Sequence, residues 1–274
     1  MRVCSPTRNE FQRVMALPLA LLSAAFLLLL STADNFSFAQ ESQANPTQAA
    51  SQSITLAAED SWPPFANQFG QGISHRLIAA AFKQSNIEVN SLVVPYSRAL
   101  MMAEKGAVDG VFNVTREVST EQRFVFGTTP LFIATASFYY KKEHAIKADN
   151  KWDLPKGTIV GVIKSYEYGD EFPLLVKQRQ LNLVQVATQQ QLINLLLIGR
   201  IDTALMFDLV AKENVQKMGV SDVVIPAFSN HSSHIYLAFS KTNPKAVLLA
   251  QALDKGLSQL KSDGQYQKLF AAEH

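Results

Sequence analysis

The sequence has almost no cysteine, with Cys4 the only one in 274 residues. Disulfide bonds, a catalytic thiolate and cysteine-ligated metal sites are therefore excluded from the rest of the chain. A glycine-rich phosphate loop, a Gly-x-Ser-x-Gly elbow and a His-Glu-x-x-His motif are also missing. The sequence gives catalysis no dedicated motif, and we expect a binding protein that needs neither a cofactor nor a metal ion.

A strong excess of one charge is missing as well. The formal net charge is +2, and 22 basic and 21 acidic residues remain once residues 1–39 are set aside. This balance gives no reason to expect nucleic acid or an anionic membrane surface as a partner. The content of hydrophobic residues, 47%, and of charged residues, 18%, is that of an ordinary globular protein.

The N-terminal segment has the pattern of a secretory signal peptide. Three arginines, the last of them Arg13, precede an apolar run over 16–30, and small residues at Ser37 and Ala39 suit a signal peptidase. The alternative is an uncleaved membrane anchor, for which about fifteen residues are few against the roughly 20 that span a bilayer. We expect a signal peptide over 1–39, cleaved near Ala39, and a flexible, Gln/Ser/Ala/Asn-rich leader over 40–53.

From Ile54 onward, short apolar strands alternate with amphipathic helices. The expected strands are 54–57, 89–94, 108–112, 124–126, 159–163, 183–186 and 202–207, and the expected helices are 73–84, 97–106, 168–178 and 189–198. Alternation of this kind predicts parallel strands covered by helices, with ligands at the carboxyl ends of the strands. Because the pattern occurs twice, we predict an α/β protein with two similar lobes rather than one sheet.

Two further extended segments, 134–142 and 235–240, are predicted to lie side by side. A helix that starts near Pro244 and a short helix over 265–271 should pack back on the first lobe. The predicted division is a first lobe over 54–133, a second over 134–240 with a connecting strand at each end, and a return to the first lobe over 241–274. His231 and His234 fall just before the last strand, where a solvated loop is favoured over a metal site.

Four segments carry a family resemblance, in this order: 59–65 (EDSWPPF), 106–110 (GAVDG), 199–202 (GRID) followed by Asp208, and 262–264 (SDG) followed by Tyr266. They resemble the motifs of family 3 extracellular solute-binding proteins, the group that contains the polar amino acid receptors of bacterial ABC importers. The resemblance spans Ile54 to Phe270. It implies a two-lobed periplasmic-binding-protein fold of type II, with a ligand cleft between lobes joined by two crossover strands.

The resemblance also implies a function. The chain would capture a small polar or zwitterionic solute, an amino acid or a related compound, in the periplasm, and would act as a monomer that delivers it to an ABC permease in the inner membrane. An enzyme similar to cyclohexadienyl or arogenate dehydratase is an alternative, in which Glu59 could act as general acid. A ligand-sensing module without transport is another.

The candidate ligand-binding residues lie at the ends of predicted strands. The stretch 109–131 leaves a strand as a polar loop with two arginines, which suits a small polar ligand. The resemblance places Glu59, Trp62, Asn113, Thr115, Ser165, Tyr166 and Asp208 at the ligand, and the further candidates are Phe65, Tyr96, Arg98, Arg116 and Arg123. In the family, an acid at the place of Asp208 often pairs with an amino-acid ammonium.

One departure from the family pattern concerns an arginine. Amino-acid receptors usually place an arginine about six residues before the phenylalanine of a Phe-Ser-x-Pro strand, and counting back from Phe126 gives Thr120. Arg116 is our first choice for a substitute because a guanidinium donates two parallel hydrogen bonds to a carboxylate. Arg123 is the second choice, although a structural ion pair is the simpler expectation for it and an equal one for Arg98.

Overall fold

The computed structural model describes residues 52–271, which lie within the compact unit Ala49–His274. The predicted signal peptide, Cys4 and nearly all of the predicted leader lie outside the described residues. None of the helices in 52–271 has the length and apolar character that a membrane span requires.

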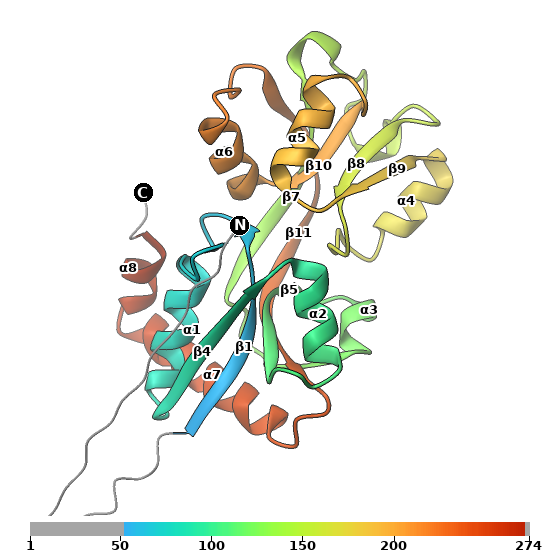
Figure 1. Ribbon diagram of the computed structural model, residues 1–274. Helices are drawn as coiled ribbons and strands as arrows, with labels where there is room; N and C mark the ends of the chain where they lie inside the picture. Colours follow the sequence, from blue (N-terminus) through green and yellow to red (C-terminus); the bar gives the residue numbers. More distant parts are fainter. Residues whose placement is uncertain (1–51, 272–274) are drawn as a thin grey trace, which may run out of the picture. The chain divides into compact units, whose positions relative to one another are not determined.

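The first half of the fold is built on three parallel strands, in the order β4-β1-β5, with β1 over Gln52–Glu59, β4 over Ile87–Val94 and β5 over Gly110–Thr115. Side chains of β1 alternate between two cores, because Leu56 packs on the side of helix α1 (Ile73–Lys83) and Ala57 on the side of helix α2 (Tyr96–Glu104). Figure 1 shows these two helices on opposite faces of the strands.

The second half repeats this pattern with the parallel strands β10 (Thr203–Phe207), β8 (Ile159–Ile163) and β9 (Asn182–Val186). Helix α4 (Phe172–Arg179) packs on one face and α5 (Gln189–Leu197) on the other. Two short 3-10 turns, η1 (Lys142–His144) and η2 (Lys151–Asp153), precede β8. The prediction of two strand-helix repeats is confirmed.

Two long antiparallel strands connect the halves. β7 (Phe132–Lys141) and β11 (Val224–Ser240) pair along most of their length, and β11 also pairs with β5 and with β6 (Phe124–Phe126), while β7 pairs with β10. One nine-stranded sheet therefore runs through both halves. The two halves are the two predicted lobes, but the expectation that they do not share one sheet is wrong. The reason is the 17-residue length of β11, which lets it pair in both halves.

Several element boundaries differ from the predictions. β11 begins at Val224, so His231 and His234 are exposed residues of a strand and not of a loop. Helix α4 begins four residues later than expected, at Phe172, and α2 begins at Tyr96, directly after Pro95 and one residue before its expected start. Helices α3 (Val118–Glu121) and α6 (Asp208–Lys217) were not predicted.

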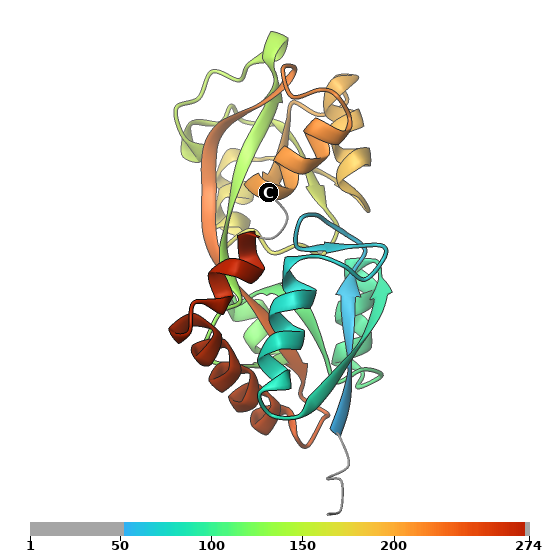
Figure 2. The ribbon, with the colours of Figure 1, turned by 90° about the vertical axis from the view of Figure 1, so that its left-hand side faces the viewer.

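The C-terminal helices α7 (Ala246–Ser262) and α8 (Gln265–Ala271) pack on α1 of the first half, and Figure 2 shows the three helices together. The α1–α7 contact is close because Gly256 has no side chain, and a Cβ atom there would lie 2.2 Å from the Ala81 carbonyl oxygen. The Tyr266 hydroxyl donates to the Leu131 carbonyl oxygen over 2.6 Å and thereby holds α8 at the start of β7.

Candidate functional site

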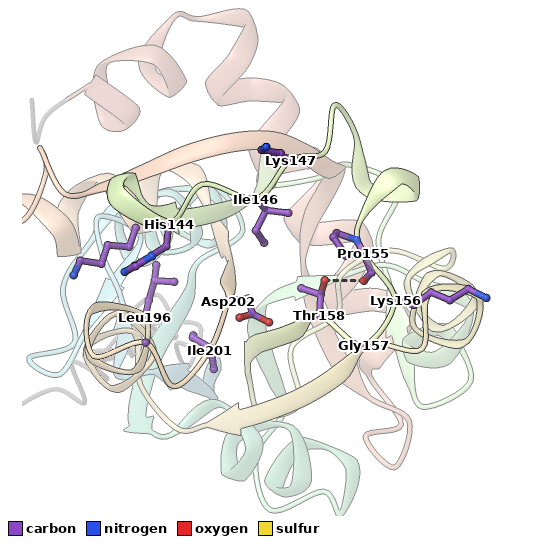
Figure 3. Close-up of a pocket in the computed structure, with 12 residues that line it drawn as sticks. His144, Ile146, Lys147, Pro155, Lys156, Gly157, Thr158, Leu196, Ile201 and Asp202 are labelled. Atoms are coloured by element: carbon purple, nitrogen blue, oxygen red, sulfur yellow. Dashed lines mark hydrogen bonds between the residues drawn. The ribbon is translucent and has the colours of Figure 1, made fainter.

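A broad cavity of about 530 Å³ lies at the amino-terminal ends of the second-half strands (Figure 3). Its lining includes Thr158, directly before β8, and Asp202, directly before β10, together with surface lysines such as Lys147. The Asp202 carboxylate accepts a 2.7 Å hydrogen bond from the Ile159 backbone N–H and so has a structural role. Ligands of open α/β sheets bind at the opposite, carboxyl ends of the strands.

At the carboxyl ends, polar and aromatic side chains from both halves surround one small cavity. Residues that end or directly follow β1, β4, β5, β8 and β10 meet there, together with one residue of the short strand β2 (Ser61–Trp62), which pairs with β3 (Ala66–Asn67). The lining residues are Glu59, Trp62, Tyr96, Asn113, Thr115, Tyr166, Glu167 and Phe207. The topology of both halves thus brings their strand ends to a single place.

Two reciprocal carboxyl–phenol hydrogen bonds cross this cavity. Tyr166 of the second half donates its hydroxyl to Oε1 of Glu59 in the first half, and Tyr96 of the first half donates over 2.8 Å to Oε2 of Glu167 in the second half. The two tyrosine rings meet edge to face with their centroids 5.0 Å apart. Each half therefore supplies one acid and one phenol to a shared cluster.

Burial makes both acids resist ionisation. It raises the pKa of Glu59 to about 8, an effect that the hydrogen bond from Tyr166 opposes and that the negative charges of Asp60 and Glu167 reinforce. It also raises the pKa of Glu167 to about 8, against the hydrogen bond from Tyr96. None of the ion pairs within residues 52–271 that the structure gives involves either acid.

Asn113 occupies a special backbone position at the floor of the cavity. Its φ of 66° is in the left-handed region, which non-glycine residues seldom adopt and which asparagine tolerates better than most. Its Oδ1 accepts a 2.5 Å hydrogen bond from the Ser74 hydroxyl, while its Nδ2 is buried without a partner among the described residues. The amide therefore has hydrogen-bonding capacity to offer a ligand.

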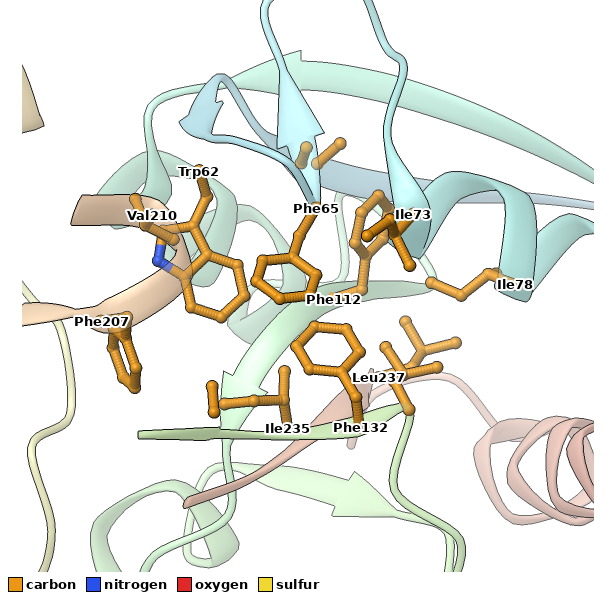
Figure 4. Packing of buried hydrophobic residues seen from close by; sticks show 14 of the residues in the cluster. Trp62, Phe65, Ile73, Ile78, Phe112, Phe132, Phe207, Val210, Ile235 and Leu237 are labelled. Atoms are coloured by element: carbon orange, nitrogen blue, oxygen red, sulfur yellow. The ribbon is translucent and has the colours of Figure 1, made fainter. Parts of the chain in front are cut away.

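Trp62 forms an aromatic wall of the cavity, and Figure 4 shows it between Phe65 and Phe207. The centroid of its ring lies 4.9 Å from that of Phe65 in the same half. It lies 5.2 Å from the ring centroid of Phe207 in the other half, with the two rings edge to face. The side chain is only 2% exposed, and its Nε1 is a second buried donor with no partner in the part of the chain described. In Figure 4 the indole nitrogen lies on the side of the ring that faces Phe207.

The cavity is very small in this arrangement. Its volume is about 10 Å³, which is about the space for one water molecule. Two further hydrogen bonds join the halves beside it: the Gly169 N–H donates to Oε1 of Glu117 over 2.6 Å, and the Val118 N–H donates to Oδ1 of Asp170 over 3.2 Å. A solute of several heavy atoms fits only if the halves separate or the tyrosine side chains turn away.

Six of the candidates from the sequence are brought together in the lining: Glu59, Trp62, Tyr96, Asn113, Thr115 and Tyr166. Two further lining residues, Glu167 and Phe207, were missed. Each had a signal in the sequence, because Glu167 follows Tyr166 in the loop after β8 and Phe207 is the last residue of β10.

Three of the candidates that do not line the cavity are Phe65, Ser165 and Asp208. Phe65 is 1% exposed in the core and stacks on Phe132 with centroids 4.1 Å apart. Ser165 is exposed in the loop after β8, with a positive φ of 67°. Asp208 begins α6 and accepts a 2.9 Å hydrogen bond from the Tyr139 hydroxyl.

The candidate arginines also lie outside the lining. Arg116 pairs with Glu121 over 2.6 Å and donates to the Gly127 carbonyl oxygen, and 38% of its side chain is exposed. Arg123 pairs with Glu104 over 3.0 Å, and Arg98 is exposed on α2. Each guanidinium is thus either paired with an acid of its own half or directed to solvent.

Thr120 stands at the position where the resemblance implies an arginine. The residue is completely buried, and its hydroxyl donates to the Thr115 carbonyl oxygen over 2.8 Å while accepting from the Glu117 N–H. It closes the first turn of α3 in a capping box with Glu117. Thr120 is therefore a structural residue and brings no positive charge to the cavity.

The chemistry of the cavity is that of recognition by hydrogen bonding and charge. It offers two carboxyl groups, two unpartnered donors and four aromatic rings within one enclosure. The described residues contain no group of three or more His, Cys, Asp and Glu side chains suited to hold a metal ion. A carboxyl with a raised pKa also has the property that a general acid requires.

Solved structures with a similar fold include three of different kinds. They are a histidine kinase sensor domain with similarity to periplasmic binding proteins (19% identity, TM-score 0.69, 80% of this chain and 95% of that chain covered), the ancestral amino acid-binding protein AncCDT-1, a precursor of cyclohexadienyl dehydratase (20%, 0.65, 80% and 93%), and the amino acid ABC transporter substrate-binding protein AbpA from Streptococcus pneumoniae bound to L-arginine (21%, 0.65, 80% and 92%). These similarities establish the two-lobed periplasmic-binding-protein fold.

No curated protein matches the chain. The family model of bacterial extracellular solute-binding proteins, family 3, matches residues 54–272. The match covers most of the chain, including both halves and the connecting strands. The chain therefore belongs to family 3 of the bacterial extracellular solute-binding proteins.

Proposed function

We propose that this protein captures a small polar or zwitterionic solute between its two lobes and delivers it to an ABC importer. The first lobe is the β4-β1-β5 half and the second is the β10-β8-β9 half. The observation that carries this proposal is the pair of reciprocal bonds between Glu59 and Tyr166 and between Tyr96 and Glu167, because it places polar groups of both lobes around one point.

Closure of the lobes over the solute is the proposed mechanism. β7 and β11 connect the lobes, so a change in their backbone angles separates the strand ends of the two lobes. A solute that contacts both lobes binds the closed form more tightly than the open form and shifts the equilibrium by that difference. The hydrogen bonds of Glu117 and Val118 to the loop after β8 would then support the closed form.

The proposed setting is the periplasm, after removal of a signal peptide near Ala39. The family is extracellular by description, and AbpA is a substrate-binding protein of an ABC transporter. The proposed partner is an ABC permease in the inner membrane, and the proposed solution state is a monomer. N-terminal sequencing of the exported protein checks the cleavage site, and light scattering of the purified chain checks that it is a monomer.

Calorimetry against amino acids, amines and small carboxylates tests the site. We expect a solute that binds the parent protein and loses at least about tenfold in affinity with Trp62→Ala and with Glu59→Gln. Glu88→Gln, an exposed acid on β4, is the matched control and should bind like the parent. Unchanged affinity in both site variants would place the solute elsewhere.

A transport assay separates import from sensing. The first step is to look for a permease and an ATPase encoded beside this gene. Such a pair is reconstituted in liposomes, and ATP hydrolysis is measured with and without the solute-loaded protein. Stimulation of hydrolysis by the loaded protein supports the importer role. A lack of stimulation, together with solute binding to the protein, supports a sensory module.

One observation favours a second candidate function, an enzyme of the dehydratase type. Burial holds the pKa of Glu59 at about 8, so at pH 7 the group keeps a proton that it could donate to a leaving group. Against this, a dicarboxylate such as prephenate would meet two acids and no paired cation in the cavity. Spectrophotometry with prephenate and arogenate decides, because formation of the aromatic product would overturn the binding role.

A further inference from the structure

The proposed function leaves the solute open, and the cavity points to one class. We propose, on the basis of that function, that the solute is a small organic cation with N–H donors and a neutral hydrogen-bond acceptor, such as an amine or guanidine, and that it carries no carboxylate. Four features of the cavity support this class: its acids, its lack of a cation, its unpartnered donors and its rings.

The acids are placed to accept hydrogen bonds from a cation. Glu59 and Glu167 lie on opposite lobes, and each already accepts one hydrogen bond from a tyrosine of the other lobe. A protonated amine between them can donate to both carboxylates, which a quaternary ammonium cannot do. Charge-assisted bonds of this kind are about twice as strong as the neutral bonds that they replace.

A carboxylate on the solute would find no matching cation in the lining. None of the eight lining residues is basic. Arg116 is paired with Glu121, Arg123 with Glu104, and the buried Thr120 stands where the family arginine is expected. The carboxylate of an amino acid would lose its hydration there without gaining a counter-charge, and its own charge would oppose ionisation of the two acids.

The acids alone would not define a site, and two buried donors supply the independent observation. Trp62 Nε1 and Asn113 Nδ2 belong to lining side chains that are 2% and 5% exposed, and neither has a partner among residues 52–271. A buried donor without an acceptor destabilises a protein. A hydroxyl, ether or carbonyl oxygen on the solute would satisfy these donors without adding charge.

The aromatic rings complete the environment of a cation. Tyr96, Tyr166, Phe207 and Trp62 line the cavity, and successive centroids in this group lie 5.0, 6.2 and 5.2 Å apart. The negative faces of such rings attract ammonium and guanidinium groups. The same rings exclude water, which strengthens the contact between the cation and the two acids.

Binding of a cation should also release protons. Burial holds the pKa of both acids near 8. The titratable and charged groups that act on Glu59 are Tyr166, Asp60 and Glu167. Those that act on Glu167 are Tyr96, Glu117 and Arg123. A cation between the acids favours their ionised forms, so protons leave as the solute enters. The affinity should therefore rise from about pH 6 to about pH 8.

The experiment compares pairs of solutes that differ only by a carboxylate: agmatine with arginine, cadaverine with lysine, and tyramine with tyrosine, with choline as the quaternary cation. Isothermal titration calorimetry should give at least one amine that binds about tenfold or more tightly than its parent amino acid. Equal or tighter binding of the amino acids overturns the inference but leaves the solute-binding function intact. If none of these compounds binds but another solute of the wider panel does, the inference is likewise overturned and the solute-binding function stands. If nothing in either panel binds, both the inference and the proposed function are overturned.

Variants and proton counts place the cation between the acids. Glu59→Gln and Glu167→Gln should each reduce amine affinity by about tenfold or more, while Glu88→Gln leaves it unchanged. If a variant fails to fold, titration of the parent protein in buffers of different ionisation enthalpy counts the protons directly. Net proton release on amine binding supports the inference, and proton uptake or no exchange overturns it.

Discussion

Replacement of Glu59 by glutamine should flatten the dependence of stability on pH. Burial raises the pKa of this carboxyl from its ordinary value of 4.5 to about 8. Between these two values the folded chain holds one more proton here than the unfolded chain, so the free energy of unfolding falls as the pH rises. The contribution of Glu59 is fully present below pH 4.5 and is lost as the pH approaches 8.

The size of the effect follows from proton linkage. One extra proton gives a slope of about 1.4 kcal/mol per pH unit, and the full range of about 3.5 units sets an upper limit of about 5 kcal/mol. Between about pH 5 and about pH 7 the free energy of unfolding of the parent should fall by about 2–3 kcal/mol relative to Glu59→Gln. Opening of the cleft would hydrate the carboxylate and bring the value toward the lower end.

Urea unfolding at several pH values measures this difference. The parent, Glu59→Gln and Glu88→Gln are compared between about pH 5 and about pH 8, with the midpoint and the slope of each transition determined separately. Glu88→Gln keeps an ionisable Glu59 and should follow the parent closely. Parallel curves for the parent and Glu59→Gln would refute the reasoning, because they would mean that the carboxyl ionises normally in the folded chain.

Three further predictions follow from single contacts. Trp62→Phe keeps the aromatic wall but removes the Nε1 donor, so solute affinity should fall by about tenfold in calorimetry while the melting temperature changes little. Gly256→Ala should lower the free energy of unfolding by about 1–3 kcal/mol in urea, because its Cβ would lie 2.2 Å from the Ala81 carbonyl oxygen. Arg116→Ala should change solute affinity less than about twofold, because the guanidinium is held by Glu121 outside the lining, and a larger loss would return the arginine to the site.

The elements that the sequence predicts best are those whose signals lie within or next to the element in the sequence. β8 matches its predicted bounds because an apolar run stands between Gly157 and the polar loop after Ile163. α5 begins where expected because Thr188, directly before it, caps the helix and accepts a 3.2 Å hydrogen bond from the Gln191 N–H. Local signals of this kind can be recognised in the sequence without knowledge of the rest of the chain.

The missed elements depend on partners that are distant in sequence. The first part of β11 is polar, and its strand conformation is fixed by pairing with β7, as in the register of Ser229 with Ser137 and of Ser232 with Thr135. Helix α6 has few apolar residues, and Val210 and Val215 become core positions only when the second half packs around them. Tertiary contacts therefore override weak local patterns in both places.

The candidate site also contains residues that the sequence could predict and residues whose positions depend on tertiary contacts. Glu59, Tyr96 and Tyr166 could be chosen from the sequence because strand ends of parallel sheets converge, whatever the side chains are. The positions of Arg116 and Arg123 could not, because the acids that hold them, Glu121 and Glu104, are brought close only by the folded chain. A charged residue near a strand end is thus a weaker predictor of ligand contact than its position suggests.

The cavity couples closure to the charge of what it holds. With the lobes together, the acids Glu59 and Glu167 accept only neutral phenol hydrogen bonds, and burial keeps both acids protonated near neutral pH. An anion would enter this enclosure without a counter-charge, and a neutral solute would leave the acids as they are. A cation alone lets both acids ionise in the closed form, and it gains their attraction at the low dielectric that closure creates. Discrimination between solutes therefore comes from the closed form itself, whose lining holds two acids and no basic residue.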